Sequence, residues 1–275
     1  MCQFKSAILT KDEKLYHSCF TDAHEDLIDM FHLHDTKKSF DFQNFIRLEF
    51  VPPSQDEYDK VNEYKLIVDE SNPPEWFDKK MKNRTISKMR RIIKNMIVED
   101  ERYILIGGAY IIKGSAKIKN VQNCIIHSVS DNATIENVCS NATIRNVCDN
   151  ATIENVYNNA TIENVCSNAT IRNVYDNATI ENVYNNATIR NVCDNATIEN
   201  VCSNATIGNV CSNATIRNVY DNATIRNVRN NATIENVCSN ATIRNVRNNA
   251  TIRNVHDNAT IENVCSNATI VNDSR

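Results

Sequence analysis

The sequence predicts two parts: an α+β domain over residues 1–106, then an all-β solenoid over residues 107–275 with two nonapeptide repeats (18 residues) in each coil. Three observations predict the solenoid. The motif Asn-Ala-Thr-Ile-x-Asn-Val-x-x recurs without a gap from Asn132, in sixteen copies of which the last begins at Asn267. Its alanine and isoleucine stand two residues apart, which is strand spacing. It is also rich in β-branched residues, and a period of nine drifts around a helical turn.

The motif has nine positions, numbered here from 1 (the first Asn) to 9. We expect Ala at position 2, Ile at 4 and Val at 7 to face inward and Thr at 3 to face outward, with a bend near position 6. Nine residues are too few to close a coil around a filled interior, whereas eighteen leave room for two strands and two turns. Two copies per coil are therefore predicted, and three are the alternative. Stacking at about 4.8 Å makes eight coils about 40 Å long.

Asparagine recurs at positions 1 and 6 of every complete copy. Identical amides on successive coils can bond to one another along the stacking axis, and a buried amide without partners would cost a few kcal/mol. Ladders are therefore expected at both positions, which is a structural role. Because the chain has only 4 Gly and 4 Pro, we expect Asn, Asp and Ser to make the turns.

The repeat array resembles known solenoids. Its Asn–Val spacing is similar to that of the asparagine-ladder β-rolls of plant ice-binding proteins, and its short tiled repeat is similar to pentapeptide-repeat solenoids. The array also resembles uncharacterised repeat proteins of gut bacteria and their phages, which implies a bacterial or phage origin. It departs from the pentapeptide repeats, which have a period of five, and it lacks the Gly-Gly and Asp positions of calcium-binding nonapeptides. Imperfect copies precede Asn132, and the earliest, Gly108–Ile111, is expected to be an irregular capping rung.

Three positions vary between copies. Position 5 holds Glu or Arg, except at Gly208 and Val271; position 8 holds mostly Cys, Tyr, Arg or His; position 9 holds mostly Ser, Asp or Asn. Alternating Arg and Glu cannot point into a thin apolar core, so these positions are expected to face water. Each set is connected by codon transitions. The variation therefore fits either a tunable binding surface or neutral drift on a face that needs only to be soluble.

Counting by eighteen predicts a group of arginines on one face. Arg226, Arg229, Arg244 and Arg247 should cluster, and Arg172 and Arg190 should continue the row. Such a group is a candidate anion-binding or partner-binding patch. The alternative is an ordinary solvated face.

The other polar residues of the repeats predict no chemistry. Nine of the eleven cysteines lie from Cys124 onward. Without a secretory signal we expect free thiols, although Cys148 and Cys166, and Cys193 and Cys211, should be one coil apart. No closed metal-ligand set is expected. We found no signal peptide and no apolar stretch long enough to span a membrane, so the sequence predicts a cytoplasmic protein.

The first 106 residues predict a small α+β domain. The expected elements are a hairpin of Gln3–Leu9 with Lys14–His17, a helix over Thr21–His32 capped by Thr21, strands at Phe45–Val51 and Tyr64–Val68, and a long helix from Asn72-Pro73-Pro74-Glu75 to about Val98.

Two features of this domain could carry chemistry. The long helix is basic and could bind nucleic acid, although such charges more often form only the solvent-exposed face of an amphipathic helix. Its candidate residues are Lys79, Lys82, Lys88, Arg90, Arg91 and Lys94. His17, Cys19 and His24 can ligate metals, and a cleft that groups them would favour catalysis in this domain, but their spacing matches no known metal motif.

Together these features predict a non-catalytic structural or interaction protein without a cofactor. A protein partner is favoured, nucleic acid is a further possibility, and the solenoid ends could self-associate. One alternative is a nucleic-acid mimic or anion-binding inhibitor of a DNA-handling enzyme. However, Asn132–Arg275 carries 13 acidic and 10 basic residues, far from the acidity that a mimic needs. Ice binding through threonine columns is a second alternative, which charged neighbours and the absent secretion signal disfavour.

Overall fold

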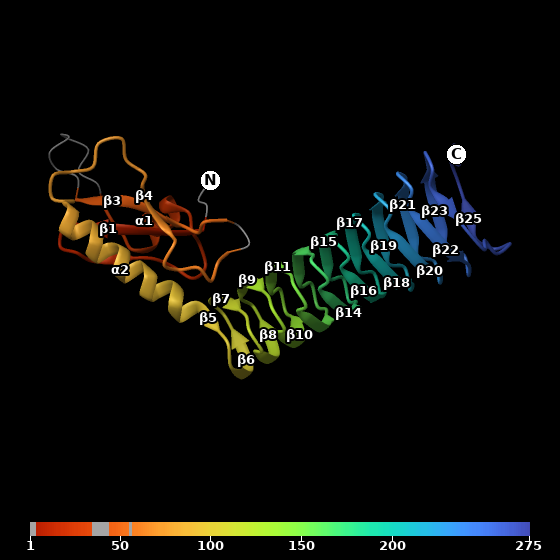
Figure 1. The fold of residues 1–275 in the computed structure, drawn as a ribbon, viewed down its shortest axis with the longest axis horizontal. Coiled ribbons are helices and arrows are strands. Elements are labelled where there is room, and N and C mark those ends of the chain that lie inside the picture. Colours follow the sequence, from red (N-terminus) through yellow and green to blue (C-terminus); the bar gives the residue numbers. More distant parts are fainter. Residues whose placement is uncertain (1–3, 35–43, 55–56) are drawn as a thin grey trace. The chain divides into compact units, whose positions relative to one another are not determined.

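The computed structural model describes residues 4–34, 44–54 and 57–275 and confirms an α+β region followed by a parallel β-solenoid (Figure 1). The chain divides into two units between Ile97 and Val98. The solenoid therefore begins earlier than residue 107, because β5 (Ile97–Val98) and β6 (Glu101–Ile106) already join its two sheets. No helix among the described residues is long and apolar enough to cross a membrane.

The N-terminal unit, called the head here, is built on a four-stranded antiparallel sheet in the order β2-β1-β3-β4. Its strands are β1 (Lys5–Thr10), β2 (Leu15–Tyr16), β3 (Phe45–Val51) and β4 (Lys65–Val68). The hairpin and both further strands were predicted, and Gln3 lies outside the described residues. Neighbouring residues of β1 serve opposite faces: Ile8 packs with Leu27 of α1 (His24–Met30), and Leu9 packs near Met81 of α2 (Lys79–Met96).

Both head helices start later than predicted. Thr21 does not cap α1; its hydroxyl donates to Asp26 Oδ2 and accepts from the amide of Ala23, which holds the preceding turn. The prolines after Asn72 form a non-helical turn, since a residue before proline avoids the helical region. Helix α2 starts instead at Lys79 and is capped by Asp78, whose side chain accepts from Met81 N at 2.7 Å.

The solenoid consists of two parallel sheets whose strands alternate along the chain. The even sheet holds β6, β8 and every even strand to β24, and the odd sheet holds β5, β7 and every odd strand to β25. The first strands are β7 (Ala109–Ile112), β8 (Lys117–Gln122), β9 (Ile125–Val129) and β10 (Thr134–Cys139). Strands β11 to β23 are five residues each, from Thr143–Val147 to Thr251–Val255, and β24 (Thr260–Ile261) and β25 (Thr269–Ile270) end the array.

Strand pairing confirms two motif copies per coil. Thr188 of β16 pairs with Thr206 of β18, and Thr179 of β15 pairs with Thr197 of β17, so equivalent residues lie eighteen apart on the same sheet. Alanine, isoleucine and valine at positions 2, 4 and 7 are fully buried through most of the array, while threonine at position 3 stays partly exposed. The core is thus a continuous stack of branched aliphatic residues and alanine.

Asparagine ladders form at position 6. One column runs from Asn120 to Asn263 in the even sheet and another from Asn146 to Asn272 in the odd sheet. Each side-chain Nδ2 donates to the Oδ1 of the coil before it, for example from Asn209 at 2.8 Å. Several of these Nδ2 groups also donate to the position 5 backbone carbonyl of the preceding coil. The asparagine side chain thus gives a hydrogen-bond donor to a carbonyl next to the bend.

The expected ladder at position 1 does not form. In most coils the residues at positions 9 and 1 both have positive φ, as at Asn185 (51°) and Asn186 (65°). The position 2 amide donates to the position 8 carbonyl, as from Ala187 to Tyr184 at 3.1 Å. Two successive positive φ angles with this bond describe a type I′ turn, which favours Asn, Asp and Gly. Position 1 is therefore asparagine because of its backbone conformation.

Candidate functional site: the arginine face

Position 5 of the even sheet carries the predicted arginines on neighbouring strands. Arg172, Arg190, Arg226 and Arg244 lie on β14, β16, β20 and β22, and all four are exposed. They share one sheet because their strands pair in register at intervals of eighteen residues. The outward direction follows from the buried isoleucine that precedes each of them in a strand.

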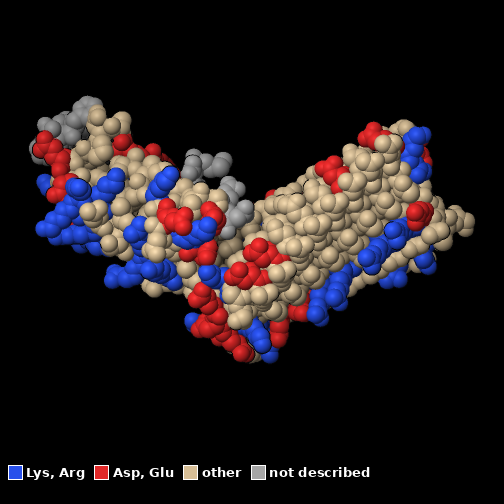
Figure 2. All heavy atoms as spheres, viewed as in Figure 1, with Lys and Arg blue, Asp and Glu red and all other residues tan. Residues whose placement is uncertain are grey.

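Two further arginines stand beside the end of this row. Arg229 and Arg247 follow β20 and β22 at position 8 and are exposed. We call the six residues Arg172, Arg190, Arg226, Arg229, Arg244 and Arg247 the arginine face. Figure 2 shows a band of blue spheres along the solenoid, on the side where Figure 1 places β14 to β22. The only acidic residues in the even-sheet repeats from Arg172 to Arg247 are Asp176 and Asp194, at the corners after β14 and β16.

Few of these guanidinium groups are neutralised. Arg172 pairs with Glu154 at 3.1 Å. Arg190, Arg226 and Arg244 have no acidic partner among the described residues. Like charges on adjacent strands repel, so an anion that approaches this face relieves repulsion as well as gaining attraction.

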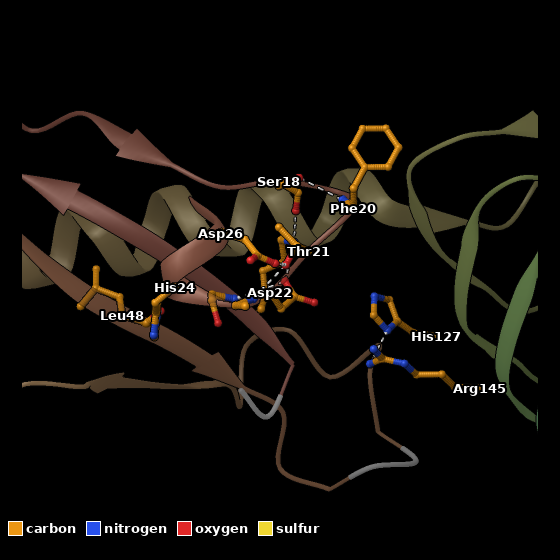
Figure 3. Close-up of polar contacts among 12 residues, drawn as sticks. Ser18, Phe20, Thr21, Asp22, His24, Asp26, Leu48, His127 and Arg145 are labelled. Carbon is orange, nitrogen blue, oxygen red and sulfur yellow. Dashed lines mark hydrogen bonds and ion pairs between the residues drawn. The ribbon is translucent and has the colours of Figure 1, made fainter. Parts of the chain in front are cut away.

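The odd sheet presents a different pattern at the same position. Its outer row reads Arg145, Glu163, Glu181, Glu199, Arg217, Glu235 and Arg253. Charges of opposite sign compensate there: Arg217 Nη1 lies 2.7 Å from Glu199 Oε2 one coil before it. Arg145 contacts the ring nitrogen of buried His127 at 3.3 Å (Figure 3). The two sides of the solenoid therefore differ in net charge.

A hollow interrupts the arginine row, and the sequence had not predicted it. Gly208 of β18 takes position 5 between Arg190 and Arg226, and a cavity of about 470 Å³ lies over it. Its lining includes Thr188, Arg190, Thr206 and Arg226. Counting by eighteen places Gly208 between Arg190 and Arg226 in the sequence, but it does not show that the surrounding side chains leave a hollow there.

Position 8 is less exposed than predicted. Cys139, Cys148 and Cys166 are buried, and Cys193 and Cys211 are half-buried. All ten described cysteines are free. Burial, with Cys211 nearby, raises the pKa of Cys193 to about 12. Tyr157 and Tyr175 stack at 5.2 Å between ring centroids, because the same position recurs on adjacent coils.

The threonine columns are in register on both sheets, as ice binding would require. Each threonine, however, lies two residues from a position 5 side chain on the same outer surface. Charged rows therefore run beside the threonines, as the sequence predicted.

Several basic side chains of helix α2 bond to other residues of the head. Arg84 pairs with Glu13 at 2.6 Å, and Lys88 donates to the carbonyl of Glu13 at 2.7 Å. Arg90 donates to the carbonyl of Asn62 at 2.7 Å. Of the other predicted residues, Lys79, Lys82, Arg91 and Lys94 are exposed. These four, with exposed Lys80, are the cations that α2 presents to solvent without a partner among the described residues of the head.

The head histidines take structural positions. Buried His24 lies 3.1 Å from the carbonyl of Leu48 (Figure 3) and 3.4 Å from Asp69 Oδ2. Burial and the nearby Lys5 ammonium lower the pKa of His17. Lys5 is buried and pairs with Asp22 at 2.8 Å. Within the described residues, no three His, Cys, Asp or Glu side chains are grouped to hold a metal, so His17, Cys19 and His24 do not converge.

Fold and surface together define this chain as a β-solenoid repeat protein with asparagine ladders and an α+β head. No family model, curated protein or solved structure matches it in a comparison with known proteins.

Proposed function

We propose that this is a non-catalytic interaction protein whose solenoid holds the arginine face against an acidic surface of a partner protein. The observation that carries the proposal is the charge difference between the two sheets. In the even sheet three of the row's guanidiniums lack acidic partners, whereas the odd-sheet row holds four glutamates among three arginines.

The scaffold supports this role. The arginines stand on strands that are bonded to both neighbours, and each strand is tied to the next by an asparagine bond of about 3 Å. A surface held in this way loses little conformational freedom on binding, which favours affinity. Arginine also suits the task, since its planar group binds carboxylates in a bidentate manner.

The test is binding to defined acidic polymers. The full chain is titrated into fluorescent poly-L-glutamate at low and moderate salt, and its affinity is compared with that of a variant in which Arg226, Arg229, Arg244 and Arg247 are changed to Glu. We expect the reversal to weaken binding at least tenfold and to remove its salt dependence. The matched control reverses Arg145, Arg217 and Arg253 of the odd sheet and should change the affinity less than twofold.

Equal losses in the two variants would reject the arginine face as the binding surface. A single-stranded oligonucleotide with the same number of negative charges forms a second arm. Clearly tighter binding to that strand than to poly-L-glutamate would reject an acidic protein in favour of nucleic acid, which binds through stacking as well as charge. Because the stacked rings of Tyr157 and Tyr175 stand three or more coils before Arg229 in the position 8 column, we expect no such preference.

A further inference from the structure

We infer that the hollow over Gly208, called the Gly208 notch here, binds a phosphomonoester group. This inference rests on the proposed function, because Arg190 and Arg226 belong to the arginine face, and it names the chemical group that the face recognises. Three features of the notch support it: its position in the row, its main-chain floor and its unpaired charges.

The position of the notch follows from the coil period. Gly208 lies eighteen residues after Arg190 and eighteen before Arg226, on the strand between theirs. The backbones of those two arginines are therefore two strand spacings apart, about 10 Å. Every other position 5 from Glu136 to Glu262 carries a long charged side chain, so only here can a ligand reach the sheet between two arginines.

The floor of the notch is main chain. A Cβ atom built on Gly208 would lie 2.5 Å from the carbonyl oxygen of Arg190, which is closer than side chains tolerate. The pairing of Thr188 with Thr206 and of Asn191 with Asn209 is nevertheless kept. The main chain of Arg190 therefore occupies the place where a side chain would leave Gly208, and Gly208 itself lines the open volume.

The charges of the notch match a dianion. Arg190 and Arg226 have no acidic partner among the described residues, and Thr188 and Thr206 also line the hollow. A phosphomonoester carries about −1.5 to −2 charges at neutral pH and three acceptor oxygens. Two guanidiniums neutralise that charge and can bind two edges of the group, with threonine hydroxyls left for the remaining oxygen. A carboxylate has only one charge for the same two cations.

The group could belong to a phosphoserine of a partner protein or to a small phosphorylated molecule. The experiment measures binding of the full chain to a fluorescent peptide with one phosphoserine, to the same peptide with glutamate there, and to inorganic phosphate as competitor. We expect the phosphopeptide to bind at least tenfold tighter than the glutamate peptide. If inorganic phosphate binds as tightly as the phosphopeptide, with the same dependence on Gly208, the notch is assigned to a small phosphate ligand.

Gly208→Arg is the decisive variant, since it adds a positive charge but fills the notch. The inference predicts that it abolishes the preference for phosphoserine, whereas a face acting only through its total charge would bind the phosphopeptide more tightly. Arg190→Gln and Arg226→Gln should each weaken phosphopeptide binding about tenfold, and Arg253→Gln on the odd sheet less than twofold. These glutamine variants do not alter a backbone contact, so they test the phosphate site even if Gly208→Arg fails to fold.

The inference and the proposed function fail in different ways. If the two peptides bind with equal affinity, the phosphate site at the Gly208 notch is rejected. If poly-L-glutamate binding is still lost on reversal of Arg226, Arg229, Arg244 and Arg247, the arginine face is retained as the binding surface. Phosphoserine preference that persists in Gly208→Arg also overturns the notch.

Discussion

Replacing one rung of an asparagine ladder should open the solenoid locally. Asn182 lies in the middle of the odd sheet, away from the arginine face. Its Nδ2 donates to Asn164 Oδ1 at 3.1 Å and to the Glu163 carbonyl at 3.4 Å, and its Oδ1 accepts from Asn200 at 3.0 Å. Asn182→Ala removes all three bonds and leaves half-buried polar groups unpaired. At roughly 1 kcal/mol per bond, with an added penalty for the unpaired groups, we expect a loss of about 2–4 kcal/mol.

Hydrogen exchange is the suitable assay, because a stacked repeat array does not unfold in a single two-state step. The amides of Thr179 and Tyr184 bond to the preceding coil at 3.0 Å and exchange only when the coils separate. A loss of 2–4 kcal/mol corresponds to exchange faster by about 30- to 1,000-fold. The matched control is Asn186→Gly at position 1. Asn186 has a φ of 65° and no side-chain hydrogen bond among the described residues, so glycine should change exchange by less than about threefold. Similar exchange in the two variants would refute the ladder's role.

Three further predictions concern the core, a thiol and the head. Ile198 is fully buried, so Ile198→Ala should lower the local stability by about 2–5 kcal/mol, seen as faster exchange in its own and adjacent coils; a change under 1 kcal/mol would contradict a close-packed core. Because burial raises the pKa of Cys193 to about 12, that thiol should react with iodoacetamide at pH 8 at least tenfold more slowly than exposed Cys19, as mass spectrometry of the modified peptides would show, and equal rates would count against its burial. The same raised pKa means that the unfolded chain loses this proton first, so the thiol's contribution to stability is present below about pH 8.5 and is lost as the pH rises above it. Asp22→Ala leaves the buried Lys5 ammonium without its carboxylate and should cost the head about 3 kcal/mol in a thermal melt, whereas an unchanged melting temperature would show that the pair is not structural.

The sequence predicted the solenoid closely because its period is fixed by covalent spacing. Strand alternation placed Ala, Ile and Val inside, and the length needed to close a coil gave eighteen residues, which the pairing of Thr188 with Thr206 confirms. The start of the solenoid was missed because residues 98–106 do not follow the motif. Strand β6 exposes Tyr103, Ile104 and Ile106, and it pairs with β8 through residues sixteen apart, as Glu101 with Lys117, instead of the eighteen of the regular coils.

The errors in detail have local physical causes. Asparagine satisfies both amide ladders and left-handed turns, so its recurrence at position 1 could not distinguish between them until the φ angles were known. Asn72 and Asp78 are both good helix caps, and the choice of Asp78 depends on Trp76 and Phe77, which pack near Leu9, Ile46 and Leu48 before the helix starts.

The arginine face could be predicted by counting, since every eighteenth residue shares a face once two copies make a coil. The Gly208 notch could not, because the hollow depends on the side chains of the coils on either side and on the carbonyl of Arg190. The absence of acidic partners for Arg190 and Arg226 is likewise a property of side-chain placement in three dimensions.

Every surface proposed above requires that residues eighteen apart be neighbours, and spin-label distances test this most directly. Labels on non-canonical amino acids, which avoid the native cysteines, are placed at residues 226 and 244 in one sample and at 226 and 253 in another. The observed register predicts strong spin–spin coupling at 226/244, whose backbones lie about 4.8 Å apart. It predicts much weaker coupling at 226/253, since these residues lie on opposite sheets about 10 Å apart and point away from each other. Strong coupling at 226/253 with weak coupling at 226/244 would mean twenty-seven residues per coil, and the arginines of the arginine face would then not be neighbours.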